Sequence, residues 1–188
     1  MNIIIFGPPG AGKGTQSKFI ANKFKMFQLS TGEFLRKEIS NNTKIGGKIA
    51  SIINSGSLVS DDIVSELIER VISNSKYNNQ IIFDGFPRSL NQAKILDRLL
   101  KKYNQKINIV LKLSVSLETI KKRIKERKDL EKRADDSEEI AIKRYETYEK
   151  STEPVIKYYK KLNLLKVIDG ERSIDQINKE IGDIISLI

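Results

Sequence analysis

Residues 7 to 15 form a glycine-rich run with a single lysine, and they read GPPGAGKGT. The backbone N–H groups of such a loop can point inward around a phosphate, and the start of a following helix adds partial positive charge. Lys13 is then placed to reach the β- and γ-phosphates of a nucleotide. The strict sequence pattern of a phosphate-binding loop has Ser or Thr directly after the lysine, whereas here Gly14 separates Lys13 from Thr15. The run predicts a phosphate-binding loop.

Asp84 is the second residue whose type and position indicate a chemical role. It follows the apolar run Gln80–Phe83, which is typical of a buried strand. Ligands of open α/β sheets bind at the carboxyl ends of the strands, which is where Asp84 is expected. An isolated Asp there could equally cap a turn. Beside a phosphate loop, its carboxylate is predicted to hold Mg²⁺ through water, since Mg²⁺ usually keeps several of its waters.

Arginine is used sparingly, with nine residues against 25 lysines. The guanidinium group grips phosphate oxygens with two parallel hydrogen bonds, which lysine cannot do. Six arginines are therefore predicted to bind phosphates, and they are Arg36, Arg88, Arg123, Arg127, Arg133 and Arg144. Arg70, Arg98 and Arg172 lie outside any motif, and we expect them to be structural.

Composition excludes several other kinds of chemistry. The 188 residues include no Cys and no His, so a disulfide, a thiolate nucleophile, a Cys/His zinc site and an imidazole base are all excluded. No apolar run approaches the eighteen residues of a membrane span, which favours a cytoplasmic protein without a membrane partner. The net charge of +10 leaves a nucleic-acid-binding protein as an alternative. Against it, the lysines are spread along the chain without an aromatic–basic cluster.

The elements that must position these residues alternate between strands and helices, which predicts an α/β fold with a mostly parallel sheet. The stretch from Ser30 to Ser75 shows no strand pattern and is expected to hold several helices broken at Gly46-Gly47 and Gly56. Lys128–Asp136 is expected to be an exposed loop, with Ser137 opening the next helix. The expected strands are Asn2–Phe6, Gln80–Phe83, Ile107–Leu113 and Leu164–Ile168, and the expected helices are Thr15–Lys25, Leu90–Tyr103, Leu117–Arg127 and Ile174–Ile185.

Taken together, the motifs resemble those of the adenylate kinase family among the nucleoside monophosphate kinases. Its loop is written GxPGxGKGT, and residues 84–88 (DGFPR) and 29–33 (LSTGE) with Arg36 look like two further motifs. Residues 56–59 (GSLV) resemble its GxLV turn, although Ser60 replaces the usual proline. Arg127, residues 133–136 (RADD) and Arg144 look like its lid elements. The resemblance covers positions 7 to 170.

The resemblance implies a P-loop NTPase-type parallel sheet with helices on both faces. It implies one domain over 1–188, with a monophosphate-binding insertion at 30–59 and a short lid at 127–136. The implied activity is Mg²⁺-dependent, reversible transfer from ATP to AMP, giving two ADP and serving adenine nucleotide homeostasis. The implied state is a monomer. Such a reaction needs no general base, because the attacking AMP phosphate is already anionic.

The resemblance also implies roles for particular residues. The catalytic set is Lys13, Arg88, Arg123, Arg133 and Arg144. The ATP-binding set is Gly10, Ala11, Gly12, Lys13, Gly14, Thr15, Arg127 and Gly170. The AMP-binding set is Thr31, Arg36, Ser57, Leu58, Val59, Gly85, Phe86, Pro87, Arg88, Gln92, Arg133 and Arg144.

The nearest alternative within the kinases is a UMP/CMP kinase. The pyrimidine enzymes usually place Asn directly after the DGFPR arginine, and here that residue is Ser89. Gln92 carries both a donor and an acceptor, so it can pair with N6 and N1 of adenine. The sequence therefore favours AMP over UMP and CMP.

Overall fold

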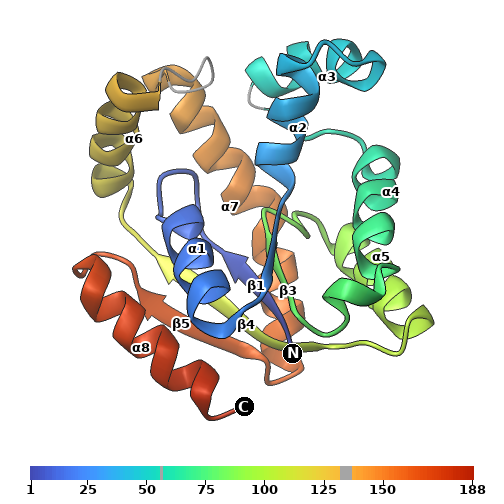
Figure 1. Cartoon of the computed structure of the whole chain (residues 1–188). Helices are drawn as coiled ribbons and strands as arrows, with labels where there is room; N and C mark the ends of the chain where they lie inside the picture. The colour runs from blue at the N-terminus through green and yellow to red at the C-terminus, as the bar shows by residue number, and fades with distance from the viewer. Residues whose placement is uncertain (56, 132–136) are drawn as a thin grey trace.

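A five-stranded, fully parallel sheet forms the centre of the molecule. The computed structural model describes residues 1–55, 57–131 and 137–188. The strands lie in the order β2-β3-β1-β4-β5 (Figure 1). Their bounds are β1 Asn2–Phe6, β2 Phe27–Ser30, β3 Ile81–Asp84, β4 Ile107–Ser114 and β5 Leu165–Asp169. The predicted α/β class with a parallel sheet is confirmed.

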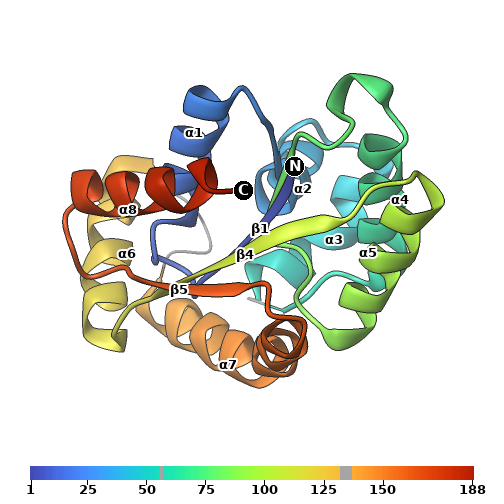
Figure 2. The same cartoon turned by 90° about the horizontal axis from the view of Figure 1, so that it is seen from below.

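Helices cover both faces of this sheet, as Figure 2 shows with α1 and α8 on one side and α7 on the other. Because side chains alternate along a strand, β1 supplies both cores. Ile3 and Ile5 pack toward α1 and α8, whereas Ile4 and Phe6 pack toward α4, α5 and α7. The helices are α1 Lys13–Phe24, α2 Thr31–Ser40, α3 Lys44–Asn54, α4 Asp61–Ile72, α5 Leu90–Lys102, α6 Leu117–Glu131, α7 Glu138–Lys161 and α8 Ile174–Ser186.

The carboxyl ends of the inner strands meet at one edge of the sheet. Ile5 of β1 is in register with Asp84 of β3, and Asp84 is in register with Ser30 of β2. The glycine-rich loop therefore leaves β1 beside Asp84. Gly12 is the N-cap of α1 at φ +90°, a left-handed conformation that favours glycine. The register brings the two motifs together although they lie some seventy residues apart in sequence.

Three predictions about the elements are wrong. Strand β2 was not predicted, because it is a four-residue edge strand in which Leu29 is the one buried residue. Helix α3 runs through Gly46-Gly47, and the chain instead turns before Thr43, whose side chain caps α3. Helix α6 continues to Glu131, so residues 128–131 are helical rather than a loop. Ser137 does cap the next helix, as predicted. Gly56 lies outside the described residues.

Gly46 allows α3 to lie directly against the end of α2. A Cβ atom at this position would stand 2.1 Å from the carbonyl oxygen of Glu38 and 2.9 Å from the Cα atom of Ile39. The neighbouring Gly47 has no atom within 4 Å of the same point. Gly46 thus serves close helix packing, Gly47 does not, and neither glycine breaks the helix. Among the described residues, no helix is both long and apolar enough to cross a membrane.

We predict that Gly46→Ala destabilises the protein and that Gly47→Ala does not. The methyl group at 46 must push α2 and α3 apart, at a cost of about 2 kcal/mol or more. At 47, alanine has less backbone entropy to lose when the helix forms than glycine does. Gly47→Ala is therefore expected to raise the free energy of unfolding by up to about 1 kcal/mol. Thermal and urea unfolding of the two variants measures the difference. Equal stability of the two variants would contradict the proposed α2–α3 contact.

Candidate functional site

Three adjoining cavities lie at the carboxyl edge of the sheet, and Arg88 and Arg144 line all of them. The largest contains about 1130 Å³ of space and opens to solvent. It lies between the glycine-rich loop, α2 and α6. Figure 1 shows α2 and α6 on opposite sides of this loop. Its lining includes these predicted site residues: Gly10, Gly12, Lys13, Gly14, Thr15, Arg36, Asp84, Gly85, Arg88, Arg123, Arg127 and Arg144.

Lys13 lies at the centre of this lining. Its Nζ donates to the carbonyl oxygens of Gly7 at 2.7 Å and Pro8 at 3.0 Å, so the loop itself holds the ammonium group in place. Removal from water lowers the pKa of Lys13 to about 7. The positive charges of Arg88, Arg144 and Arg127 contribute to this lowering, while Asp84 opposes it. The low pKa of Lys13 thus arises mainly from its burial and in smaller part from the neighbouring arginines.

Asp84 is buried at the end of β3, with 7% of its surface exposed. Burial raises the pKa of its carboxyl group, whereas Lys13 and a hydrogen bond from Gln28 Nε2 at 3.2 Å act in the opposite direction. The described residues contain no group of three or more acidic, His or Cys side chains suited to a metal ion. One carboxylate facing a phosphate cavity nevertheless fits Mg²⁺, because Mg²⁺ takes its remaining ligands from phosphates and water.

A second cavity of about 590 Å³ lies between α2, the turn before α4 and the loop after β3. Polar groups hold the loop end of this cavity in place. Thr31 Oγ1 donates to the carbonyl oxygen of Gly85 at 3.0 Å, and Arg88 Nε donates to the same oxygen at 2.8 Å. The predicted residues that line it are Thr31, Arg36, Ser57, Leu58, Val59, Gly85, Arg88, Gln92 and Arg144.

Gln92 is 3% exposed and already makes two hydrogen bonds. Its Oε1 accepts from the backbone N–H of Arg88 at 2.7 Å, and its Nε2 donates to Asp61 Oδ1 at 2.7 Å. Asp61 is a residue that sequence reasoning missed. An acidic residue in the first turn of a helix indicates only a favourable helix-dipole interaction, so no sequence signal linked Asp61 to Gln92.

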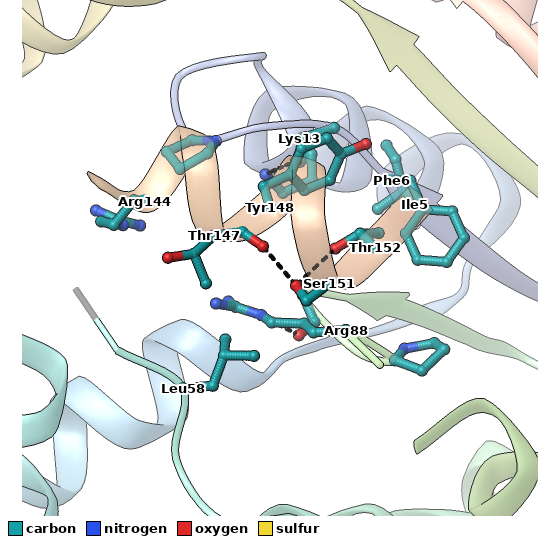
Figure 3. Close-up of a pocket in the computed structure, with 14 residues that line it drawn as sticks. Ile5, Phe6, Lys13, Leu58, Arg88, Arg144, Thr147, Tyr148, Ser151 and Thr152 are labelled. Atoms are coloured by element: carbon teal, nitrogen blue, oxygen red, sulfur yellow. Dashed lines mark hydrogen bonds between the residues drawn. The ribbon is translucent and has the colours of Figure 1, made fainter. Parts of the chain in front are cut away.

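The third cavity, of about 530 Å³, separates the loop from α7 (Figure 3). Thr147, Tyr148, Ser151 and Thr152 line it, and none of them was predicted. Their spacing by three and four residues places them on one face of a helix, which is the signal that could have found them. The hydroxyl of Tyr148 is buried and makes no hydrogen bond within the described part of the chain. Tyr148 and Lys13 both line this cavity (Figure 3).

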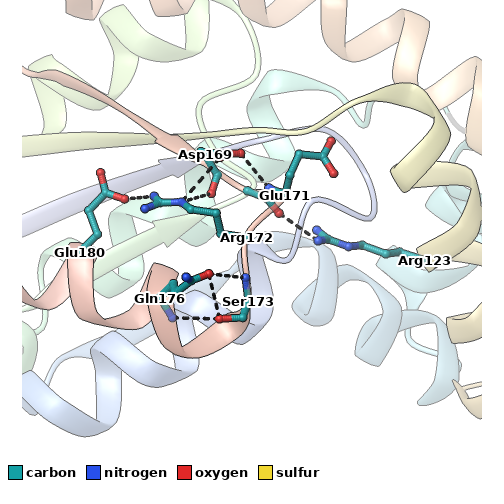
Figure 4. Close-up of polar contacts among 8 residues, drawn as sticks. Arg123, Asp169, Glu171, Arg172, Ser173, Gln176 and Glu180 are labelled. Atoms are coloured by element: carbon teal, nitrogen blue, oxygen red, sulfur yellow. Dashed lines mark hydrogen bonds and ion pairs between the residues drawn. The ribbon is translucent and has the colours of Figure 1, made fainter.

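Arg123 occupies a different end of the site from Lys13. Its NH2 group donates to the carbonyl oxygen of Gly170 at 2.9 Å, in the loop after β5 (Figure 4). Glu171 in the same loop accepts hydrogen bonds from Thr119 Oγ1 and from the Ser116 N–H, both at 2.6 Å, and these bonds lower its pKa to about 2. The start of α6 is thereby tied to the loop that carries Gly170.

Three of the predicted site residues that the structure describes do not line these cavities. Ala11 and Phe86 are buried in the core, and Gly170 packs against β4, where its N–H donates to the Ser114 carbonyl oxygen at 2.8 Å. Pro87 lines the third cavity. Arg133 falls within 132–136, outside the described residues, as does half of the predicted lid.

The comparisons with known proteins agree with one another. A family model described as adenylate kinase matches residues 5–164. A protein of Pelagibacter ubique named adenylate kinase is 42% identical, with all of both chains covered. Proteins of the same name from Maricaulis maris and Caulobacter sp. strain K31 are 42% and 38% identical, covering 94% and 100% of each chain.

We predict that the protein takes up a proton from solution when a nucleoside triphosphate binds to it at pH 8. With a pKa of about 7, Lys13 is mostly neutral at that pH. Bound phosphates restore its charged form, because an adjacent anion raises a lysine pKa. Uptake close to one proton at pH 8, falling toward zero at pH 6, is expected from calorimetry in buffers of different ionisation enthalpy. Lys13→Met is the control and should abolish this pH-dependent uptake. Equal proton uptake in both proteins would contradict the assignment of the proton to Lys13.

Proposed function

The chain belongs to the adenylate kinase family, and from this premise we propose that it transfers the γ-phosphoryl group of ATP reversibly to AMP, forming two ADP. The observation that carries the proposal is the shared lining of the cavities. Arg88 and Arg144 line both the cavity of the glycine-rich loop and the cavity of Thr31 and Gln92. Two phosphorylated substrates bound in these cavities would meet between the two arginines.

We propose that ATP binds in the large cavity with its phosphates on the glycine-rich loop. The backbone N–H groups of this loop and the start of α1 would hold the phosphates, with Lys13 on the β- and γ-phosphates. Arg127 lines the same cavity. Gly170 would lie beside the adenine, where Arg123 donates to its carbonyl oxygen. The proposed backbone and side-chain contacts come from Gly10, Ala11, Gly12, Gly14 and Thr15.

We propose that AMP binds in the cavity of about 590 Å³. Arg36 and Arg88 supply positive charge for its phosphate, and Gln92 supplies an amide for its base. Thr31 holds the loop of Gly85 through its hydroxyl, so its contribution includes shaping the cavity. Main-chain groups from Ser57 to Val59 and from Gly85 to Pro87 would complete the pocket.

In this proposal catalysis consists of positioning and charge neutralisation. The attacking AMP oxygen is already anionic, so no side chain needs to remove a proton. Lys13, Arg88, Arg123, Arg133 and Arg144 form the proposed catalytic set and would hold the reacting phosphates in line while offsetting their charge. Mg²⁺, held by Asp84 through water, would neutralise the β- and γ-phosphate oxygens. Arg127 lowers the pKa of Lys13, which supports the proposal that both side chains act on the same phosphates.

Exclusion of water is the remaining requirement, because water in an open site would accept the phosphoryl group. The segments proposed to close are the insertion at 30–59, which includes α2 and α3, and the short lid at 127–136. Both flank the large cavity at their described ends through Arg36 and Arg127. The division into one domain with these two segments, the monomeric state and the cytoplasmic location remain predictions from the sequence.

We predict that AMP is preferred over UMP and CMP by at least ~10² in kcat/KM, because sites built around hydrogen bonds to a base reject bases that leave them unpaired. A coupled ADP-formation assay with ATP against AMP, UMP, CMP, GMP and dAMP measures it. Gln92→Leu should reduce the preference through a higher KM for AMP, with the KM for ATP nearly unchanged. Comparable rates with CMP and AMP in the unaltered protein would identify a UMP/CMP kinase instead.

We also predict that Lys13→Met lowers kcat by ~10²–10³, the effect of removing one preorganised charge. The side chain lies in a cavity and contributes little to packing, so the melting temperature without nucleotide should not fall. Circular dichroism and the same coupled assay test both parts. Activity within threefold of the unaltered protein would exclude Lys13 from catalysis.

A further inference from the structure

Asp61 holds two consecutive amide side chains at the start of α5. Its Oδ1 accepts from Gln92 Nε2 at 2.7 Å, and its Oδ2 accepts from Asn91 Nδ2 at 2.6 Å. Asp61 comes from the first turn of α4, thirty-one residues away in sequence from Gln92. It does not line the cavity that Gln92 lines. The carboxylate therefore stands behind the amide rather than in the cavity.

The two partners of Gln92 fix which way round its amide lies. The backbone N–H of Arg88 can only donate, and it meets Oε1 at 2.7 Å. The carboxylate of Asp61 only accepts, and it meets Nε2. If the amide turned over, a donor would face the Arg88 N–H and an oxygen would face the carboxylate. Both hydrogen bonds would be lost at a site that is 97% buried from solvent, since Gln92 is 3% exposed.

Each of these bonds uses only part of the amide. One N–H of Nε2 and one lone pair of Oε1 remain for a ligand. The amide thus offers the cavity one donor and one acceptor in a fixed order along its edge. A purine base would form hydrogen bonds with such an edge through its positions 1 and 6. Adenine presents an acceptor at N1 and a donor at N6, whereas 6-oxopurines present a donor at N1 and an acceptor at O6.

The order of donor and acceptor therefore decides between the two classes of purine. An amide that can turn over satisfies either class, because its oxygen and nitrogen simply exchange places. An amide that is held in one orientation satisfies one class and leaves unpaired buried groups with the other. Discrimination then depends on what holds the amide, as well as on the amide itself.

We infer that Asp61 is a positioning residue that locks the Gln92 amide in the orientation that pairs with adenine, and that it thereby excludes 6-oxopurine monophosphates. The inference rests on the proposed binding of AMP by Gln92. It assigns Asp61 no contact with substrate. Asn91 occupies the second oxygen of the carboxylate and keeps its plane directed at Gln92.

The adjacent Asp62 provides a matched control. It lies in the same first turn of α4, so it shares the favourable interaction with the helix dipole. Its side chain is exposed. Asp61→Asn and Asp62→Asn thus remove the same charge from the same helix turn, and the first of them also replaces an obligate acceptor of Gln92 with a group that can donate or accept.

The experiment compares kcat/KM for IMP and AMP in the unaltered protein, Asp61→Asn and Asp62→Asn. IMP is used because it differs from AMP only in the 6-oxo pattern, without the 2-amino group of GMP. In Asp61→Asn we expect the IMP to AMP ratio to rise ~10-fold or more, since one of the two constraints on the amide is removed. The KM for AMP should rise, with kcat and the KM for ATP within twofold. Asp62→Asn should leave the ratio unchanged.

Several outcomes overturn the inference. A folded Asp61→Asn protein with an unchanged IMP to AMP ratio would show that Asp61 does not hold the amide. An equal rise in Asp62→Asn would show an effect of charge alone, and equal losses with AMP and IMP would show a purely structural role. If Asp61→Asn does not fold, Asn91→Ala weakens the same support and must raise the ratio by a smaller factor. Failure of the unaltered protein to phosphorylate AMP, or an AMP preference unaffected by Gln92→Leu, would instead refute the proposed function.

Discussion

Positive side chains gather around one cavity, and holding them there is the constraint on which the rest of the structure depends. Lys13, Arg88, Arg127 and Arg144 come from different segments of the chain. Burial is the main cause of the lowered pKa of Lys13, and the three arginines lower it as well. Bringing such groups together costs free energy in a protein without a ligand. The cost is offset when polyphosphates bind, because the charge is then already in position and needs no reorganisation. Asp84 is the acidic group that counteracts the repulsion at Lys13.

The sheet supplies the rigid support for this charge. Its inner strands β1 and β3 are buried throughout, and helices pack on both of their faces. A strand held in this way fixes the positions of the loops that leave its carboxyl end. The glycine-rich loop, Asp84 and the loop with Arg88 all leave that edge, so the backbones of Lys13 and Arg88 are held beside each other, whereas Arg127 and Arg144 come from α6 and α7. The predicted closing segments, by contrast, extend beyond the sheet on α2, α3 and α6.

Selectivity for the base requires a different kind of support. The charges that line the large cavity act at a distance, whereas in the proposed binding mode the base pairs with one amide whose two ends differ only in a donor and an acceptor. Asp61 and the Arg88 N–H distinguish these ends. In this proposal the α4–α5 packing bears on which nucleotide is accepted, although neither helix supplies a charge to the phosphates.

The sequence by itself determined the parallel sheet, and it predicted the phosphate loop, Asp84 and the arginines as site residues, because each depends on local patterns: apolar runs, glycine spacing and a choice of Arg over Lys. It could not reveal β2, since a short edge strand lacks a clear alternation, nor the true role of Gly46, whose missing side chain matters only once α2 lies against it. The hydroxyl-bearing face of α7 and the bonds of Asp61 to Gln92 and Asn91 were likewise decided by tertiary structure. Those contacts join segments distant in sequence, and a hydrogen bond between them depends on how helices pack, which no local spacing encodes.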